Sequence, residues 1–123
     1  MTTRRFVVNV TTIADGSATA YTPFLSGRIA AIHYIKTDFA DGVDFTITSE
    51  ATGETIWAES DVNAAKVSRP RAATNTTAGV ASLYASGGTA VNDLIRLSRD
   101  RVKIVIASGG NVKSGAFHVV TEE

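Results

Sequence analysis

The amino-acid sequence predicts an all-β fold, a two-sheet antiparallel sandwich of jelly-roll or immunoglobulin-like topology. Runs of β-branched and aromatic residues, separated by Gly, Asp and Ser, recur along the chain. An amphipathic helical period is not sustained in any segment. These runs would give roughly seven to nine short strands, as many as such a sandwich needs. A length of 123 residues fits one domain, residues 1–123, with a single core.

The first half of the chain contains the clearest strand patterns. Apolar residues alternate at Phe6, Val8 and Val10, and residues 21–24 make a short extended piece. Residues 28–37 are apolar enough for a central strand.

A β-hairpin is predicted after this central strand. Val43, Phe45 and Ile47 share one face, and residues 51–54 are short enough for a hairpin loop in which Gly53 takes a positive φ. The chain returns over residues 56–58.

The second half contains a segment with no apolar period. Residues 61–79 are rich in Ala, Asn, Thr, Ser and Arg, and we expect a long loop there. Residues 1–5 are expected to form a separate N-terminal arm. Further strands are predicted over residues 80–84, 94–97, 102–106 and 116–120, with a short helical turn as the alternative around residues 91–94.

Composition excludes several classes of function. Twelve basic residues balance twelve acidic ones, so no surplus of positive charge favours nucleic acid. The absence of cysteine excludes disulfides, thiolate nucleophiles and cysteine-type zinc sites. No secretory leader or membrane-spanning apolar run is apparent, so we expect synthesis in the cytoplasm and no membrane partner.

Two motifs resemble ligand sites only weakly. Asp38, Asp41 and Asp44 offer oxygen atoms around Gly42, but their spacing differs from that of a calcium loop, and a polar turn is the simpler interpretation. Residues 109–114 contain glycines and Lys-Ser, but Val112 stands where a phosphate-binding loop requires glycine. We therefore expect no cofactor and no metal.

No catalytic residues are predicted. His33 and His118 lie in apolar strands, and no G-x-S-x-G sequence supplies a nucleophile. Structural histidines are the simpler interpretation, and the chain is not expected to be an enzyme.

Six residues are candidates for a protein interface. Arg4 and Arg5 lie in the N-terminal arm, and Arg69 and Arg71 carry charge in the long loop. Large aromatic residues anchor many interfaces, although a core position is the alternative for both aromatic candidates and is the favoured one for the tryptophan. The two aromatic candidates are Trp57 and Tyr84.

One basic cluster is apparent. On a continuous strand Arg99, Arg101 and Lys103 would share a face, with Arg96 nearby. A solvated strand face is the simpler interpretation, and a protein neighbour is favoured over nucleic acid because the net charge is zero.

Two long stretches carry a family resemblance, IHYIKTDFADGVDFTITSEATGETIWAES and LSRDRVKIVIASGGNVKSGAFHVV. They resemble small virion proteins of tailed bacteriophages, in which a strand leads to a DGVDF-type turn, an ATGE hairpin and a closing hairpin. The resemblance begins at Ile32 and provides no catalytic motif.

The resemblance implies a capsid decoration, or cement, protein on the outside of the phage head. Its partner would be the major capsid protein or another virion subunit, and it would be a homo-oligomer, with a trimer favoured. It would be located in the virion. Alternatives are a component of the head-tail joint or tail, or a carbohydrate-binding sandwich; few exposed aromatics argue against the last.

Overall fold

The computed structural model describes residues 2–123, and they fold into eleven strands and no helix. The strands are β1 (Thr3–Thr11), β2 (Ala18–Tyr21), β3 (Leu25–Lys36), β4 (Val43–Ser49), β5 (Thr55–Val62), β6 (Lys66–Ser68), β7 (Arg71–Ala73), β8 (Asn92–Leu94), β9 (Arg96–Asp100), β10 (Val102–Ala107) and β11 (Ser114–Glu122).

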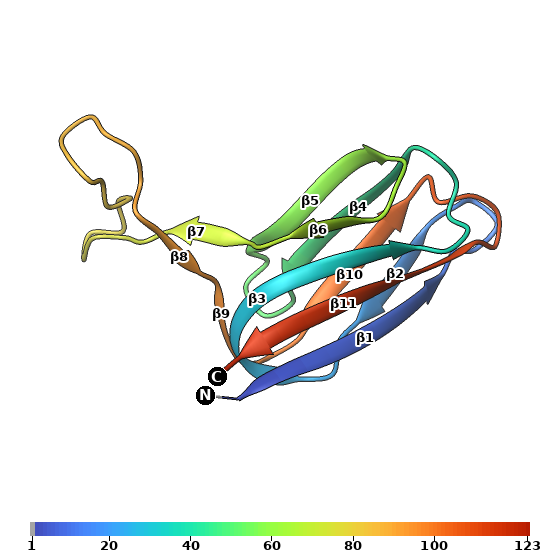
Figure 1. Cartoon of the computed structure of the whole chain (residues 1–123), viewed down its shortest axis with the longest axis horizontal. Coiled ribbons are helices and arrows are strands. Elements are labelled where there is room, and N and C mark those ends of the chain that lie inside the picture. Colours follow the sequence, from blue (N-terminus) through green and yellow to red (C-terminus); the bar gives the residue numbers. More distant parts are fainter. Residues whose placement is uncertain (1) are drawn as a thin grey trace.

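Two antiparallel sheets face one another (Figure 1). The first sheet has the order β1-β11-β3-β6, with β9 also paired to β3, and the second has the order β2-β10-β4-β5. Strand β1 thus pairs with β11, β2 with β10, β3 with β6 and β4 with β5. Strands β1–β4 alternate with later strands of the chain in both sheets, as in a jelly roll. The predicted sandwich is therefore confirmed, and of the two topologies predicted for it the jelly roll is the one observed.

Alternating side chains of both sheets fill the core. In β4 Val43, Phe45 and Ile47 are buried, as the period-2 pattern predicts. The aromatic rings cluster at the centre, where the ring of Phe117 lies 5.2 Å from those of both Tyr34 and Phe45. The predicted central strand and the β4–β5 hairpin are confirmed, and Gly53 in the hairpin loop has a φ of 76°.

One edge of the first sheet is interrupted. Residues 66–68 of β6 pair with residues 32–34 of β3, and β9 then pairs with the beginning of β3 in the same direction. Strands β6 and β9 therefore act as two halves of one edge strand. Between them the chain leaves the sandwich as a projecting arm, residues 69–95, which contains the β7–β8 ribbon (Figure 1).

This arrangement corrects several predictions. Residues 61–68 largely belong to β5 and β6, so the excursion is residues 69–95 rather than 61–79. Residues 80–84 form only isolated bridges within the arm. Residues 92–94 form β8, which excludes the helical turn that was the alternative there. Val80 and Tyr84 favour an extended backbone, but residues 80–84 pair only with other residues of the arm and not with a sheet of the sandwich.

The N-terminal arm predicted over residues 1–5 is also wrong for the part that the structure describes. Residues 3–5 belong to β1 and pair with residues 120–122 of β11. Backbone hydrogen bonding to β11 holds them, so they are not free to reach a neighbour. Met1 lies outside the described residues.

Candidate functional site

The arm is ordered by its own backbone hydrogen bonds. Strands β7 and β8 pair, and bridges join Asn75 to Ala81 and Leu83 to Ala90 beyond them. Two tight loops close the tip, one where the Thr76 amide donates to the Val80 carbonyl at 2.8 Å. The other is closed by the Tyr84 amide, which donates to the Thr89 carbonyl at 3.0 Å. The arm thus has a defined shape without a core of its own.

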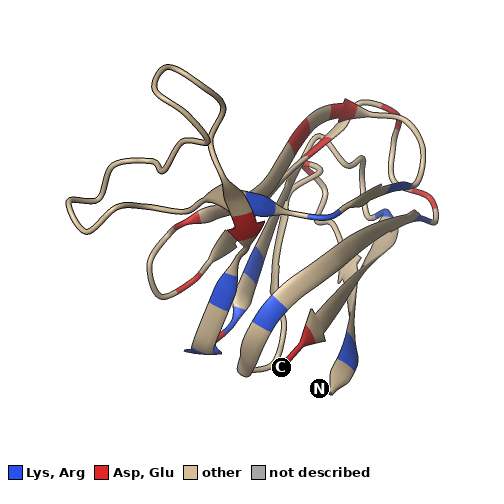
Figure 2. Cartoon of the chain, turned by 60° about the vertical axis from the view of Figure 1, so that its left-hand side comes forward, with Lys and Arg blue, Asp and Glu red and all other residues tan. Residues whose placement is uncertain are grey.

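The outer part of the arm carries no charged side chain, and its tip is apolar. Residues 72–92 contain no Asp, Glu, Lys or Arg, although 20% of the chain is charged. Figure 2 accordingly shows the projecting loops without blue or red. Three apolar side chains are exposed to solvent there: Val80 by 64%, Leu83 by 46% and Tyr84 by 74%. Exposed apolar residues usually have charged residues among them. The absence of charged residues here makes this surface resemble the centre of a protein interface.

The base of the arm is attached to the sandwich. Pro70 is buried just before β7, Ile95 is buried between β8 and β9, and Ala72 packs against the core. The amide of Ile29 in β3 donates to the Ile95 carbonyl at 3.0 Å. These contacts fix the direction in which the arm leaves the sheet.

The six predicted interface residues do not form one surface. Arg69 and Arg71 are exposed at the base of the arm, and Tyr84 lies at its tip. Trp57 is a core residue: it is 8% exposed, its ring lies 4.8 Å from that of Phe45, and its indole N–H donates to Glu59 at 3.1 Å. The Trp57 side chain is therefore unavailable to a partner, and the core alternative is correct for it.

The two remaining candidates lie on β1. Arg5 points outward from the first sheet, and its Nη1 donates to Nδ1 of His118 at 3.0 Å. Arg4 forms an ion pair with Glu123 at 3.3 Å and lines a pocket at the end of the sandwich where the termini lie (Figure 1). We call this hollow, of about 650 Å³, the basal pocket. It is lined by Arg4, Phe6, Phe24, Leu25, Ser26, Arg99 and Glu123.

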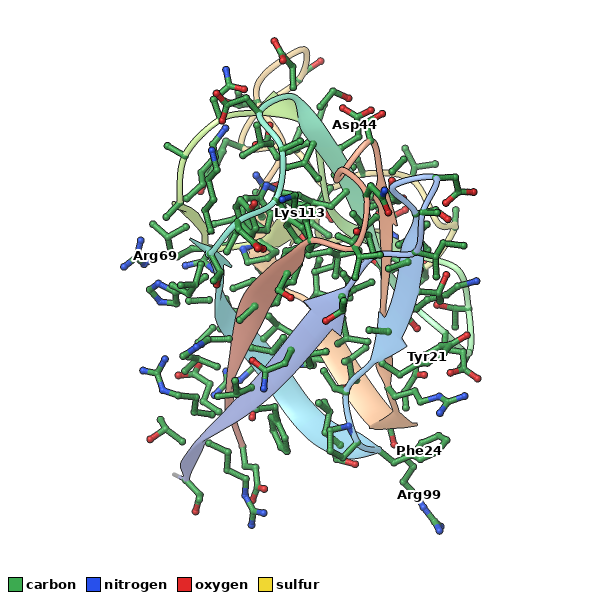
Figure 3. The ribbon with its side chains drawn as sticks, turned by 90° about the vertical axis from the view of Figure 1, so that its right-hand side faces the viewer. Tyr21, Phe24, Asp44, Arg69, Arg99 and Lys113 are labelled. Carbon is green, nitrogen blue, oxygen red and sulfur yellow. The ribbon has the colours of Figure 1, made fainter. Side chains whose placement is uncertain are left out.

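An exposed aromatic ring stands beside this pocket. Phe24 is 66% exposed, and the guanidinium of Arg101 lies 5.2 Å from its ring centre and 4.0 Å from that of Tyr21. Nη2 of Arg101 also donates to Glu50 at 3.2 Å. The hydrogen bond to Glu50, the largest contribution, raises the pKa of Arg101 above its ordinary value. In Figure 3 Tyr21, Phe24 and Arg99 lie at one end of the molecule, away from Arg69.

The chain crosses between the two sheets beside the pocket. The carboxylate of the buried Asp100 accepts hydrogen bonds from the Ser49 hydroxyl, the Ala51 amide at 3.0 Å and the Arg101 amide at 2.7 Å. Burial raises the pKa of Asp100, but these three hydrogen bonds together outweigh burial and leave that pKa below its ordinary value. Asp100 therefore joins the end of β4 and the loop after it to the backbone of Arg101.

The crossing corrects the expectation of a shared basic face. Arg99 lies in β9 of the first sheet, whereas Lys103 lies in β10 of the second sheet. The alternation that would align Arg99, Arg101 and Lys103 requires a continuous strand, but Arg101 lies between β9 and β10, where the chain passes from one sheet to the other. Sequence patterns gave no signal for the basal pocket, because its residues come from distant parts of the chain.

The three aspartates around Gly42 each contact a different part of the chain. Asp38 accepts a hydrogen bond from the Ser114 amide, Asp41 pairs with Lys36, and Asp44 accepts from the Asp61 amide at 2.9 Å. Within residues 2–123 no three His, Asp or Glu side chains are grouped to hold a metal ion. No helix that could cross a membrane is found among these residues.

The two histidines are neighbours on the outer surface of the first sheet. His33 in β3 and His118 in β11 are directly opposite one another in the register, and both are half-buried. The side-chain hydrogen bond recorded for this pair is the one that Arg5 donates to His118. Arginine is not a nucleophile, so this contact does not form a nucleophile–histidine arrangement.

Comparison with known proteins gives distant structural likenesses only. No family model matches the sequence, and no curated protein matches it. The C-terminal CBM6 of LamC, a marine laminarinase from Zobellia galactanivorans, is 12% identical with a TM-score of 0.45, over 98% of this chain and all of that one. TmCBM61, solved in complex with β-1,4-galactotriose, is 13% identical with a TM-score of 0.37, over 95% of this chain and 70% of that one.

Proposed function

We propose that this chain is a structural binding module that attaches to other protein subunits through its projecting arm. The observation that carries the proposal is the uncharged stretch 72–92, which exposes Val80, Leu83 and Tyr84 at the arm tip. The centres of protein interfaces are depleted of charged residues and enriched in aromatic ones.

The order within the arm favours binding. Since hydrogen bonds such as Ser82 N–H to the Thr74 carbonyl at 2.7 Å already fix its backbone, docking would cost less conformational entropy than for a flexible loop. Full burial of an apolar side chain of this size contributes about 1.5–3 kcal/mol. Three partly exposed side chains would together give a modest contact, which many copies on a symmetric shell would reinforce.

The finer proposal is a virion protein of the capsid decoration type. It is supported by the resemblance of residues 32–60 and 97–120 to small virion proteins of tailed bacteriophages. The partner would be the major capsid protein or another virion subunit, at the head or the tail. A trimer would arrange three arms around one local threefold axis.

The arm is tested by replacing Leu83 and Tyr84 together with Ser. The matched control is Ile13→Ser, which removes an apolar side chain 62% exposed in a loop outside the arm. Both proteins are mixed with heads of the phage that encodes the chain and sedimented, and the mass of each free protein is measured by light scattering. We expect saturable binding of wild type and the control, and at least a tenfold loss for the double variant.

Equal binding of the double variant would exclude the arm as the docking element. Saturable binding to purified tails but not to heads would retain the arm and replace the decoration proposal with a tail component. A monomeric mass for wild type at micromolar concentration would contradict the trimer.

Carbohydrate binding is a second candidate function, favoured by the exposed Phe24 ring beside the basal pocket. An aromatic wall with a few polar groups in a hollow is a common arrangement for ligand binding. The pocket and the arm occupy different parts of the molecule, so the two functions can be tested separately.

A further inference from the structure

We propose that the basal pocket binds an acidic saccharide, with one sugar ring against Phe24 and its carboxylate on Arg99. This inference rests on the second candidate function and specifies its ligand class and its two contact residues.

The aromatic side of the pocket is held in place before any ligand binds. Arg101 lies against the rings of Tyr21 and Phe24, and Glu50 fixes the guanidinium from another side. Phe24 nevertheless remains 66% exposed. A rigid, accessible ring can cover the C–H face of a sugar at little entropic cost.

The charge of this end of the molecule favours an anion. Three of its arginines are neutralised by carboxylates: Arg4 pairs with Glu123, Arg28 with Glu122 and Arg101 with Glu50. Among residues 2–123, no ion pair or side-chain hydrogen bond is recorded for Arg99. Its guanidinium is therefore available, and a planar guanidinium binds a carboxylate through two parallel hydrogen bonds.

The backbone of Arg99 is held in an unusual conformation. Its φ is 47°, in the left-handed region that non-glycine residues seldom adopt. The Arg99 amide donates to the Ser26 hydroxyl at 2.9 Å, and the neighbouring Leu25 and Asp100 are paired in the β3–β9 register. Strain of this kind persists where the surroundings impose it, and here it places Arg99 beside Phe24 in the pocket wall.

A neutral sugar would be held less well by this set of groups. Recognition of hydroxyl groups calls for acceptors as well as donors, and the one carboxylate in the wall, Glu123, already pairs with Arg4. Of the charged groups in the wall, only Arg99 has no recorded ionic partner among the described residues. A uronic acid combines the ring that Phe24 can cover with the carboxylate that Arg99 can bind.

Binding is measured by calorimetry with a trisaccharide of galacturonic acid, its fully methyl-esterified form and neutral galactotriose. The variants are Phe24→Ala and Arg99→Gln, and the control is Arg69→Gln at the base of the arm. We expect the acidic trisaccharide to bind wild type and the control, with at least a tenfold loss in both pocket variants. Affinity is expected to fall with added salt.

The outcomes distinguish failure of the acidic ligand class from failure of carbohydrate binding itself. Equal affinity for the acid and its ester, lost in Phe24→Ala alone, would overturn the acidic class while retaining carbohydrate binding. Binding that neither pocket variant weakens would place any saccharide site elsewhere. Failure of all three probes and of a broad glycan array would overturn both the inference and the second candidate function.

Discussion

Asp100 should be the most sensitive polar residue of the sandwich. Its carboxylate is buried and accepts three hydrogen bonds, from the Ser49 hydroxyl and from the amides of Ala51 and Arg101. A hydrogen bond to a charged group contributes about 1.5–3 kcal/mol, but water can partly replace the acceptor for donors near the surface. We therefore expect Asp100→Ala to lower the free energy of unfolding by about 2–4 kcal/mol, and Asp100→Asn, which keeps one acceptor oxygen, by about 1–2 kcal/mol.

The pH dependence of this effect has a definite sign. The pKa of Asp100 is lower in the folded protein than its ordinary value, so the unfolded chain takes up this proton first on acidification. The contribution of Asp100 to stability is complete above the unfolded-state pKa of about 3.9 and is lost as the pH falls through the lower folded-state pKa. The difference between wild type and Asp100→Ala should thus be constant from pH 7 to about 5 and shrink below about 4.

Urea denaturation followed by Trp57 fluorescence, at several pH values, measures both quantities. Glu54→Ala, which removes an exposed carboxylate of the β4–β5 loop, is the matched control. A loss below about 0.5 kcal/mol for Asp100→Ala, the usual range for surface changes, would refute the reasoning. A difference that grows on acidification would refute the assigned direction of the pKa shift.

Three further predictions concern the core and the arm. Gly115→Ala should destabilise by about 1–3 kcal/mol in thermal or urea unfolding, since its Cβ would lie 2.6 Å from Cδ2 of Phe39; unchanged stability would show that the Phe39 ring can shift. Tyr34→Phe should be neutral or stabilising by up to about 1 kcal/mol, because the buried hydroxyl of Tyr34 has no hydrogen-bond partner; a clear loss would mean that this hydroxyl is satisfied in solution. Joining Ser68 to Arg96 through a short Gly-Ser linker should leave the sandwich cooperative in unfolding, and failure to fold would show that Ile95 or Ala72 is essential to the core.

The strands that sequence analysis located well are those with one face in the core. Residues 43–47 and 102–106 alternate because both sheets are solvated on their outer faces, so burial follows the pleat of the strand. The hairpin between β4 and β5 was equally clear, since a loop glycine with positive φ has a direct sequence signal. These local signals were enough to predict the sandwich.

The arm was mispredicted because its strands lack that relation to a core. Residues 66–68 form a short edge strand whose apolar Val67 is exposed, so no alternation reveals it. Residues 80–84 have strand propensity, but propensity reports a fit to a pleated surface and does not say which sheet provides it. The excursion was therefore predicted over residues 61–79 rather than 69–95, both beginning and ending too early.

The basal pocket could not be found from sequence patterns. Phe24 and Arg99 are far apart in the chain, and only the pairing of Leu25 with Asp100 makes them neighbours. That pairing follows from the rolled topology, which depends on all the strands together. Each residue alone looked like an ordinary surface residue.

Because the edge strand is divided into β6 and β9, the arm between them can be replaced by another sequence. Because β6 and β9 each form their own hydrogen bonds to β3, neither depends on the length of chain between Ser68 and Arg96 to find its register. Insertions at exposed loop tips are tolerated best, and the 76–80 and 84–89 loops are such tips. A foreign peptide placed in either loop would be held away from the sandwich, and because these loops carry the proposed docking residues Val80 and Tyr84, the inserted sequence would decide what the chain attaches to.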